Sequence, residues 1–245
     1  MRFNWKSPIM KSLITLTLGF GIAYFVFSNK PVLKEIIENK IYPNKNVPKN
    51  IINRYGNYDP GKDMKFSKEE RDYFNEIAKK TEFSSEDRNP SRWMSDMKIF
   101  VEGQKQDYLM EELNKIVLEL NEIIDPIDIV VVEKKEDANY VIYFCHADEY
   151  EKHEPAVKPY IQRNWGMFCI DGGEVIKSGS MYVDIERCKG IKAQKHLLRE
   201  ELTQSLGLKN DSYSHPESIF YQVWSETTEY APIDRVLIDM LYNHW

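Results

Sequence analysis

The chain has 245 residues, and its 42% hydrophobic content is enough for one medium-sized domain with a buried core. Acidic residues number 39 against 33 basic ones, giving a formal net charge of −6. That excess argues against a general nucleic-acid-binding surface, so we expect no nucleic-acid partner. Three cysteines, Cys145, Cys169 and Cys188, lack metal-binding spacing and leave open one disulfide or three free thiols.

The beginning of the chain predicts a membrane anchor. Arg2, Lys6 and Lys11 precede an uncharged, largely apolar run over residues 12–29. As a helix, this run spans about 27 Å, close to the hydrocarbon thickness of a bilayer. A cleaved signal peptide is the alternative, but neither a small-residue cleavage motif nor a cysteine for lipid attachment directly follows the run.

The anchor hypothesis divides the chain into four parts. We expect residues 1–11 in the cytoplasm, a transmembrane signal anchor over 12–29, a polar stalk or linker over 30–65, and an extracytoplasmic domain over 66–245. The protein is then a single-pass protein of the inner membrane, with its C-terminal domain in the periplasm.

Hydrophobic periodicity predicts a domain of mixed helices and strands. Ser67 and Glu70 have the spacing of a capping box, and Leu109, Leu113 and Ile116 recur on one face of a long helix. Helices are predicted over residues 67–83, 107–124, 193–208 and 231–245. Strands are predicted over residues 97–103, 127–133, 138–147, 165–171 and 178–186.

The order of these elements predicts an α+β fold with α/β character. A long helix between the first two strands is typical of a parallel crossover, and strands that are apolar on both faces indicate a covered sheet. Residues 171–175, DGGEV, predict a hairpin turn. We therefore expect a mixed, mostly parallel twisted sheet of about five strands.

Two other groups of residues receive structural interpretations. His146 and His153 flank an acidic segment that is assigned to a surface loop. The many tyrosines and tryptophans are assigned to the core or to an interface.

Residues 199–211 have the spacing of a zinc-protease active-site helix, in the sequence REELTQSLGLKND. Metzincin-type hydrolases use H-E-x-x-H-x-x-G-x-x-H, in which the histidines bind zinc and the glutamate is the general base. With Gly207 in the glycine position, Glu201 matches the general base. Glu200, Gln204 and Asn210 then stand where the histidines would be.

Further segments resemble the same fold in the right order. Residues 215–222, HPESIFYQ, resemble a Met-turn, with Phe220 in the methionine position and Tyr221 after it. DANYVIYF and SGSMYVDI resemble two of the strands, and PIDRVLIDMLY resembles the closing helix. The resemblance implies a zincin-like fold from about Arg92 to Trp245 that lacks the zinc-binding histidines.

A bacterial family resembles the chain more closely. HLLREELTQSLGLKNDS, SIFY and PIDRVLIDMLY are similar to the family named domain of unknown function 2927, and FNEIAKKTEF extends the similarity to near Phe74. The resemblance implies an envelope protein. It also implies that the absence of the zinc-binding histidines is a pattern of the whole family. Many members look like lipoproteins, whereas this chain has an anchor without a lipid-bearing cysteine.

The side chains at the histidine positions predict no metal site. Zinc prefers imidazole and thiolate, whereas Gln204 and Asn210 offer only amide oxygens. A relocated site is the alternative, and it leaves zinc or another divalent ion open as a cofactor. Its ligands would be His196, Glu200 and either His215 or Asp211.

Three interpretations of the polar residues stay open. Leu198, Leu202 and Leu206 repeat every four residues and predict a buried stripe, which leaves Glu200 and Gln204 on a solvated face. The polar residues then form a structural network at the helix end, line a groove for a ligand or peptide, or take part in catalysis with Glu201 as the base.

The sequence as a whole predicts a membrane-anchored envelope protein. Its degenerate zincin-like domain is expected to be a non-catalytic module for protein binding or assembly. One alternative is a metal-dependent hydrolase, a peptidase by analogy, with Glu201 as general base. Another is a structural subunit of an envelope complex.

Overall fold

The computed structural model describes residues 66–80 and 89–245. The predicted cytoplasmic segment, anchor and stalk lie outside the described residues, as do the last residues of the first predicted helix. Within the described ranges, the structure contains no helix that is both long and apolar enough to cross a membrane.

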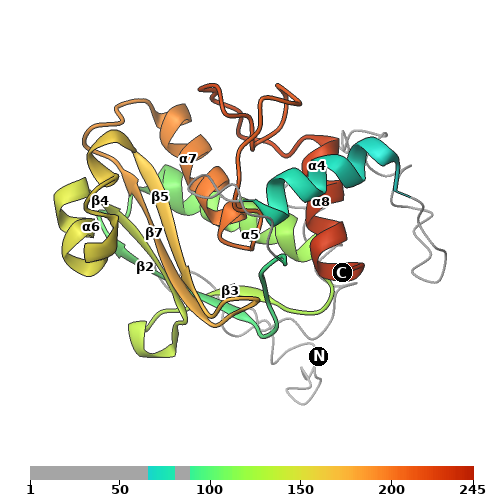
Figure 1. The fold of residues 1–245 in the computed structure, drawn as a ribbon. Helices are drawn as coiled ribbons and strands as arrows, with labels where there is room; N and C mark the ends of the chain where they lie inside the picture. The colour runs from blue at the N-terminus through green and yellow to red at the C-terminus, as the bar shows by residue number, and fades with distance from the viewer. Residues whose placement is uncertain (1–65, 81–88) are drawn as a thin grey trace, which may run out of the picture. The chain divides into compact units, whose positions relative to one another are not determined.

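A five-stranded sheet lies at the centre of the domain, with the strand order β3-β2-β4-β7-β5 (Figure 1). β2, β3, β4 and β7 run parallel, and β5 pairs antiparallel with β7 at the edge. The prediction of a mixed, mostly parallel sheet of five strands is confirmed. The strands are β2 (Met97–Gly103), β3 (Ile129–Val131), β4 (Tyr140–Cys145), β5 (Gly166–Asp171) and β7 (Ser178–Asp184).

Helices cover both faces of this sheet (Figure 1). α5 (Asp107–Ile123) and α7 (Ile191–Gln204) pack together on one face, and α6 (Ala147–His153) covers the other. α4 (Lys68–Lys79) packs against α8 (Pro232–Asn243). Because α5 connects the parallel strands β2 and β3, the predicted crossover is confirmed.

Local sequence signals explain how several elements begin and turn. Ser67 and Glu70 form the predicted capping box, in which the Ser67 side chain accepts from Glu70 N at 3.1 Å. Gly172 and Gly173 have positive φ angles and turn the chain between β5 and β7, which confirms the predicted hairpin. Within that turn, β6 (Val175–Ile176) pairs in parallel with β1 (Arg92–Trp93).

The segment around His146 and His153 forms α6, so its assignment to a surface loop was wrong. The His146 side chain accepts from Asp148 N at 3.2 Å and caps the helix. Ala147 and Tyr150 are buried on one helix face. The acidic start and basic end of this segment suit the helix dipole, and this pattern outweighs its high charge content. Among the described residues, three short 3₁₀ turns complete the connections: η3 (Lys135–Asp137), η4 (Pro155–Val157) and η5 (Ile161–Arg163).

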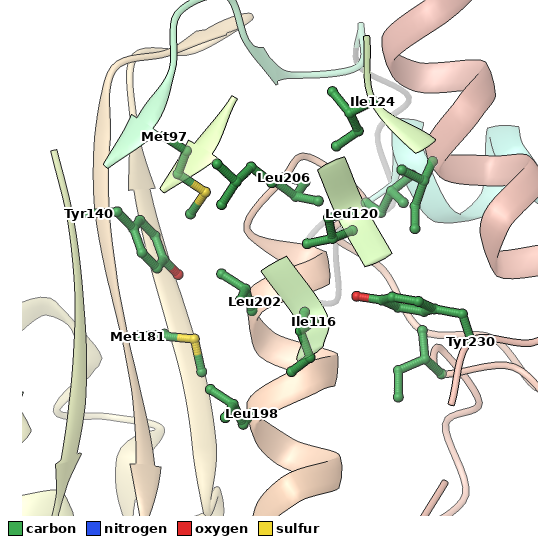
Figure 2. Packing of buried hydrophobic residues seen from close by; sticks show 14 of the residues in the cluster. Met97, Ile116, Leu120, Ile124, Tyr140, Met181, Leu198, Leu202, Leu206 and Tyr230 are labelled. Carbon is green, nitrogen blue, oxygen red and sulfur yellow. The ribbon is translucent and has the colours of Figure 1, made fainter. Parts of the chain in front are cut away.

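The main core lies between the sheet and the helix layer of α5 and α7 (Figure 2). Side chains from all three parts interlock there, and burial of each large apolar one contributes roughly 1.5–3 kcal/mol. The residues include Met97, Tyr140 and Met181 from the sheet, Ile116 and Leu120 from α5, and Leu198, Leu202 and Leu206 from α7 and its end. All of them are fully buried, so the predicted leucine stripe is confirmed.

The cysteines are free thiols in the structure. Cys145 and Cys188 are buried, and Cys169 is partly buried on β5. Burial raises the pKa of Cys169 to about 11, and nearby carboxylates add to the rise. The thiol is therefore protonated and weakly nucleophilic at neutral pH.

Candidate functional site

α7 is enclosed on nearly all sides, which corrects the prediction of a solvated polar face. It packs against β5 and β7 on the sheet and against α5 in the helix layer. Gln204 is 4% exposed and Glu201 is 8% exposed. The four-residue leucine repeat located one buried face, but it gave no sign that the opposite face is also covered.

Glu201 points its carboxylate at the edge strand. A Cβ added at Gly166, the first residue of β5, would lie 2.7 Å from Glu201 Oε1, so the absence of a side chain there makes room for the carboxylate. Burial raises the pKa of the Tyr140 hydroxyl well above its usual range, and repulsion from Glu201 adds to the rise. The Glu201 carboxyl group therefore lies next to the backbone of β5.

Gln204, Asp211 and Asn210 form a separate cluster at the helix end. The Gln204 amide donates to Asp211 Oδ1 at 2.6 Å, and the Asn210 amide donates to the Asp211 carbonyl at 2.8 Å. The Asn210 backbone N–H also bonds to the Ile77 carbonyl in α4. These contacts hold the turn after α7 against α4, as the structural-network interpretation requires.

His196 and Glu200 lie one turn apart toward the start of α7. His196 Nδ1 lies 2.8 Å from the Thr227 carbonyl, and its Nε2 lies 3.4 Å from Glu200 Oε2. The His196 ring also packs edge-on against Trp224, with the ring centres 5.9 Å apart. Burial lowers the pKa of His196, so the imidazole is neutral near pH 7.

His215 lies in a different place, so the relocated metal site does not assemble. Its ring packs at a tilt against Tyr73, with the ring centres 4.5 Å apart, and it faces Glu69 and Glu217. Within the described part of the chain, no group of three His, Cys, Asp or Glu side chains lies close enough to hold a metal ion. The positions that match the metzincin ligands do not fit zinc either, because Gln204 turns its amide nitrogen toward Asp211 and Asn210 turns its own toward a carbonyl.

Gly207 and two aromatic side chains end α7. Gly207 has φ +121°, and the Ser91 carbonyl packs against its Cα. Trp93 Nε1 donates to the Ser205 carbonyl at 3.1 Å, and the Tyr242 hydroxyl donates to the Leu206 carbonyl at 2.9 Å. Carbonyls at a helix end lack partners within the helix, and these donors satisfy them.

The predicted Met-turn residues, Phe220 and Tyr221, follow α7 in the chain. Phe220 is fully buried in the main core, and Tyr221 is half-buried beside it. The Phe220 carbonyl accepts from Ser212 N at 2.9 Å. An aromatic side chain thus fills the position that the resemblance assigns to methionine.

Asp234 fixes both ends of the loop that carries Trp224. Its Oδ1 accepts from Ser218 Oγ at 2.5 Å, and its Oδ2 accepts from Ile219 N at 3.1 Å and Ala231 N at 2.8 Å. Burial raises the pKa of Asp234 to about 6, although these hydrogen bonds oppose the rise. Sequence inspection missed this residue because it lies within an ordinary helix start.

Asp234 predicts a pH-dependent stability. Its pKa in the folded protein lies above the ordinary value for aspartate, so its contribution to stability is fully present at acidic pH and is lost as the pH rises through about 6. The free energy of unfolding of the wild-type protein should therefore fall by about 2–3 kcal/mol as the pH rises through this range. We expect this fall to be absent in Asp234→Asn, because asparagine mimics the protonated acid. Urea unfolding of both proteins at several pH values between about 4 and 7.5 tests this. A pH-independent difference between them contradicts it.

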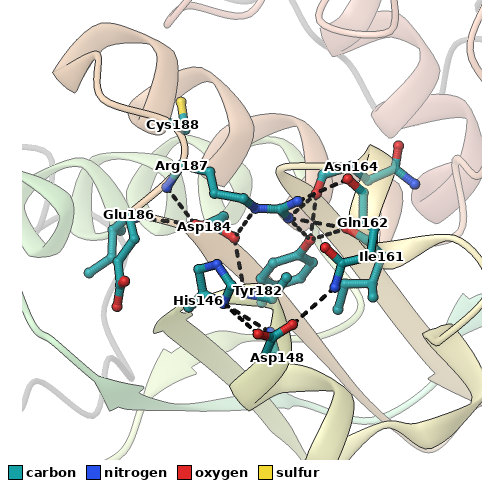
Figure 3. A network of polar contacts seen from close by, with 12 residues as sticks. His146, Asp148, Ile161, Gln162, Asn164, Tyr182, Asp184, Glu186, Arg187 and Cys188 are labelled. Atoms are coloured by element: carbon teal, nitrogen blue, oxygen red, sulfur yellow. Dashed lines mark hydrogen bonds and ion pairs between the residues drawn. The ribbon is translucent and has the colours of Figure 1, made fainter.

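A buried network anchors the segment that leads into β5 (Figure 3). Asp184 accepts from Ala147 N at 2.9 Å and from Arg187 Nε at 2.6 Å. The Arg187 guanidinium also donates to backbone carbonyls of Ile161 and Asn164, at 3.1 and 2.6 Å. Although burial opposes it, hydrogen bonds from Arg187 and Ala147 hold the pKa of Asp184 below its usual value. The start of β5 is therefore held rigidly.

β5 presents an unpaired edge beside α7. Asp184 N donates to the Trp165 carbonyl at 2.7 Å, so the alternation of an antiparallel ladder turns the odd-numbered residues of β5 toward β7. Gly166, Phe168 and Ile170 consequently direct their amide groups outward. Among the described residues, no other strand pairs with this edge, because the sheet ends at β5. Trp165 stands at the start of this edge and is 43% exposed.

Comparison with known proteins identifies the family. Two solved structures of myroilysin resemble the chain at 9% and 10% identity, covering 62% and 68% of this chain and 95% and 94% of theirs, with TM-scores of 0.40 and 0.38. No curated protein matches the chain. Residues 67–244 match the family described as Protein of unknown function (DUF2927). The chain therefore belongs to the DUF2927 family.

Proposed function

We propose that this protein is a non-catalytic protein-binding or assembly module of the cell envelope. Residues 12–29 anchor it in the inner membrane, and the domain lies in the periplasm. Its partner is a protein or an envelope complex, not a nucleic acid. The observation that carries the proposal is the outward edge of β5, with which no other described strand pairs. This edge is fixed by the Asp184–Arg187 network and lies beside Glu201 of α7.

The domain is further proposed to be zincin-like and to lack the zinc-binding histidines. This rests on the match of Glu201 and Gly207 to the metzincin spacing and on the placement of α7 against an antiparallel edge strand. The amide contacts of Gln204 and Asn210 support the loss of the metal site. In this view, the helix is kept for its shape.

The edge of β5 favours an extended polypeptide as the bound segment. An added strand forms backbone hydrogen bonds with the outward N–H and C=O groups of Gly166, Phe168 and Ile170. Because Asp184 and Arg187 fix the strand's approach, little of the protein's entropy is lost on binding.

Replacement of Phe168 by proline tests the strand-edge proposal. Proline removes only an outward N–H, which an edge strand tolerates, so the domain is expected to fold. Phe168→Ala is the matched control, because it also removes the aromatic ring but keeps the N–H. Peptides selected by display on the full-length protein in detergent micelles should bind Phe168→Ala and lose at least about tenfold in affinity for Phe168→Pro. Equal affinities for the two variants contradict strand addition.

Glu201→Gln distinguishes the binding module from the hydrolase alternative. The binding module predicts that peptide capture survives this change and that purified full-length protein contains no stoichiometric metal. A hydrolase predicts bound metal and a peptidase activity that Glu201→Gln abolishes. A structural subunit instead predicts that the protein purifies from membranes within a large complex, whichever residue is present at position 201.

A further inference from the structure

The two edges of the central sheet differ in how they are protected. β3 has three residues, and the Asn121 side chain of α5 bonds to both the N–H and the carbonyl of Ile129, at 2.8 Å each. Asp128 precedes this strand directly, and Glu133 follows it closely. Short length, a covering side chain and nearby charge are devices that keep an edge from pairing with another chain. The β3 edge is therefore closed.

The β5 edge is longer and uncharged. The strand has six residues, and residues 164–170, NWGMFCI, carry no charged side chain. The four apolar side chains from Met167 to Ile170 are half-buried, and they alternate between the two faces of the sheet. At the start of the edge, Trp165 packs against Trp224 with the ring centres 5.4 Å apart, and the two residues are 43% and 53% exposed. An uncharged apolar edge of this length is suited to pairing with another strand.

β5 is complementary to itself when a second copy lies antiparallel to it. Its outward backbone groups belong to Gly166, Phe168 and Ile170, which are evenly spaced about Phe168. A two-fold axis at Phe168 places this residue opposite its counterpart, and Gly166 opposite Ile170 of the partner subunit. All three residues then pair through backbone hydrogen bonds. No like charges face each other in this register, because Asp171 lies opposite Trp165 of the partner subunit.

We propose that β5 pairs with β5 of a second copy across a two-fold axis at Phe168, which joins the two sheets into one. This inference rests on the proposed function and names the partner for the same edge. A strand with apolar side chains on both faces and no charge pairs well with a strand of the same kind, and β5 is such a strand. The proposed anchor confines both copies to one membrane and so raises their local concentration.

Charge reversal at the axis distinguishes a second copy from any other partner. In Phe168→Lys and in Phe168→Glu, two like charges face each other across the axis, so each variant alone should be monomeric. An equimolar mixture places lysine opposite glutamate and should restore the dimer. Light scattering of the full-length protein in detergent micelles, corrected for the detergent, should give the mass of two chains for the wild-type protein and for the mixture.

Three further variants serve as controls for the charge reversal. Phe168→Pro removes the backbone donor at the axis and should be monomeric, whereas Phe168→Ala keeps that donor and should remain a dimer. Val175→Lys adds a charge to β6, where Val175 is 43% exposed, and should leave the dimer unchanged.

A disulfide tests the register. Met167 lies opposite Cys169 of the partner subunit as a non-hydrogen-bonded pair, in which the Cα atoms are about 4.5 Å apart, a distance that a disulfide can span. Mild oxidation of Met167→Cys should therefore give a covalent dimer on a non-reducing gel. The wild-type protein should give none, and neither should Met167→Cys combined with Cys169→Ser. A covalent dimer of either control overturns the proposed register.

The outcomes separate this inference from the proposed function. If the wild-type protein is monomeric while selected peptides still lose affinity for Phe168→Pro, strand addition holds and the second copy is overturned. If the wild-type protein neither dimerises nor binds peptides, both are overturned. A dimer that persists in Phe168→Pro forms at another surface, and folded charge variants whose mixture stays monomeric do not pair at this axis. Either result overturns the inference. If the charge variants fail to fold, the disulfide decides, because Met167→Cys keeps Phe168.

Discussion

Replacement of Arg199 by alanine is expected to lower the free energy of unfolding by about 3–5 kcal/mol. The Arg199 side chain is fully buried, donates to Glu112 Oε1 at 2.8 Å and Glu119 Oε2 at 2.5 Å, and stacks over the Tyr230 ring at 4.5 Å. Its loss leaves two largely buried carboxylates of α5 facing each other without their shared cation. Urea unfolding of the full-length protein in detergent micelles measures the effect.

An exposed ion pair provides the control for Arg199. Lys115 bonds to Glu229, whose side chain is 66% exposed, so Lys115→Ala should change the unfolding free energy by less than about 1 kcal/mol. A triple variant, Arg199→Met with Glu112→Gln and Glu119→Gln, should recover most of the stability, because it removes all the buried charges together. Similar losses for Arg199→Ala and Lys115→Ala would show that the buried network contributes no more than a surface pair.

Gly207→Ala is expected to destabilise the domain by several kcal/mol. The φ of +121° at Gly207 is costly for any residue with a side chain, by about 1–3 kcal/mol. In addition, an added Cβ would overlap the Ser91 carbonyl, which is backbone and cannot rotate away. Thermal unfolding of the full-length protein, followed by circular dichroism, should show a clear drop in Tm.

Gly173→Ala separates the two parts of that cost. Gly173 also has a positive φ, +72°, but a Cβ there would meet no atom within 4 Å. Its replacement should therefore show the conformational cost alone, about 1 kcal/mol. If Gly207→Ala and Gly173→Ala lose the same stability, the close approach of Ser91 does not constrain the end of α7.

The architecture was predictable because its signals are local and repeated. The capping box at Ser67, the leucine repeat of α7 and the crossover helix α5 each follow from spacing along the chain. The segment at 146–153 was misassigned because its charges suggested a loop, whereas capping and dipole effects favoured a helix. Local patterns therefore predicted the order of elements better than the exposure of their faces.

The candidate site was predictable only in part. Spacing placed Glu201 and Gly207 correctly relative to each other, but nothing local placed Gly166 against Glu201 or Trp224 beside Trp165. Those contacts join segments that are distant in the chain. The Arg199 network had one available signal, since Glu112 and Glu119 lie seven residues apart on the otherwise apolar buried face of α5.

The two aromatic donors at the end of α7 bear on how the protein is made. Trp93 and Tyr242 are 149 residues apart, and each bonds to a carbonyl just after α7. The helix that carries the candidate site can be completed only after α8 has been synthesised and has docked. Parallel strands, whose partners are also separated along the chain, fold slowly as well. The binding edge and its supporting helix should thus mature together, in one late step, so that a partly made chain has no finished surface to offer a partner.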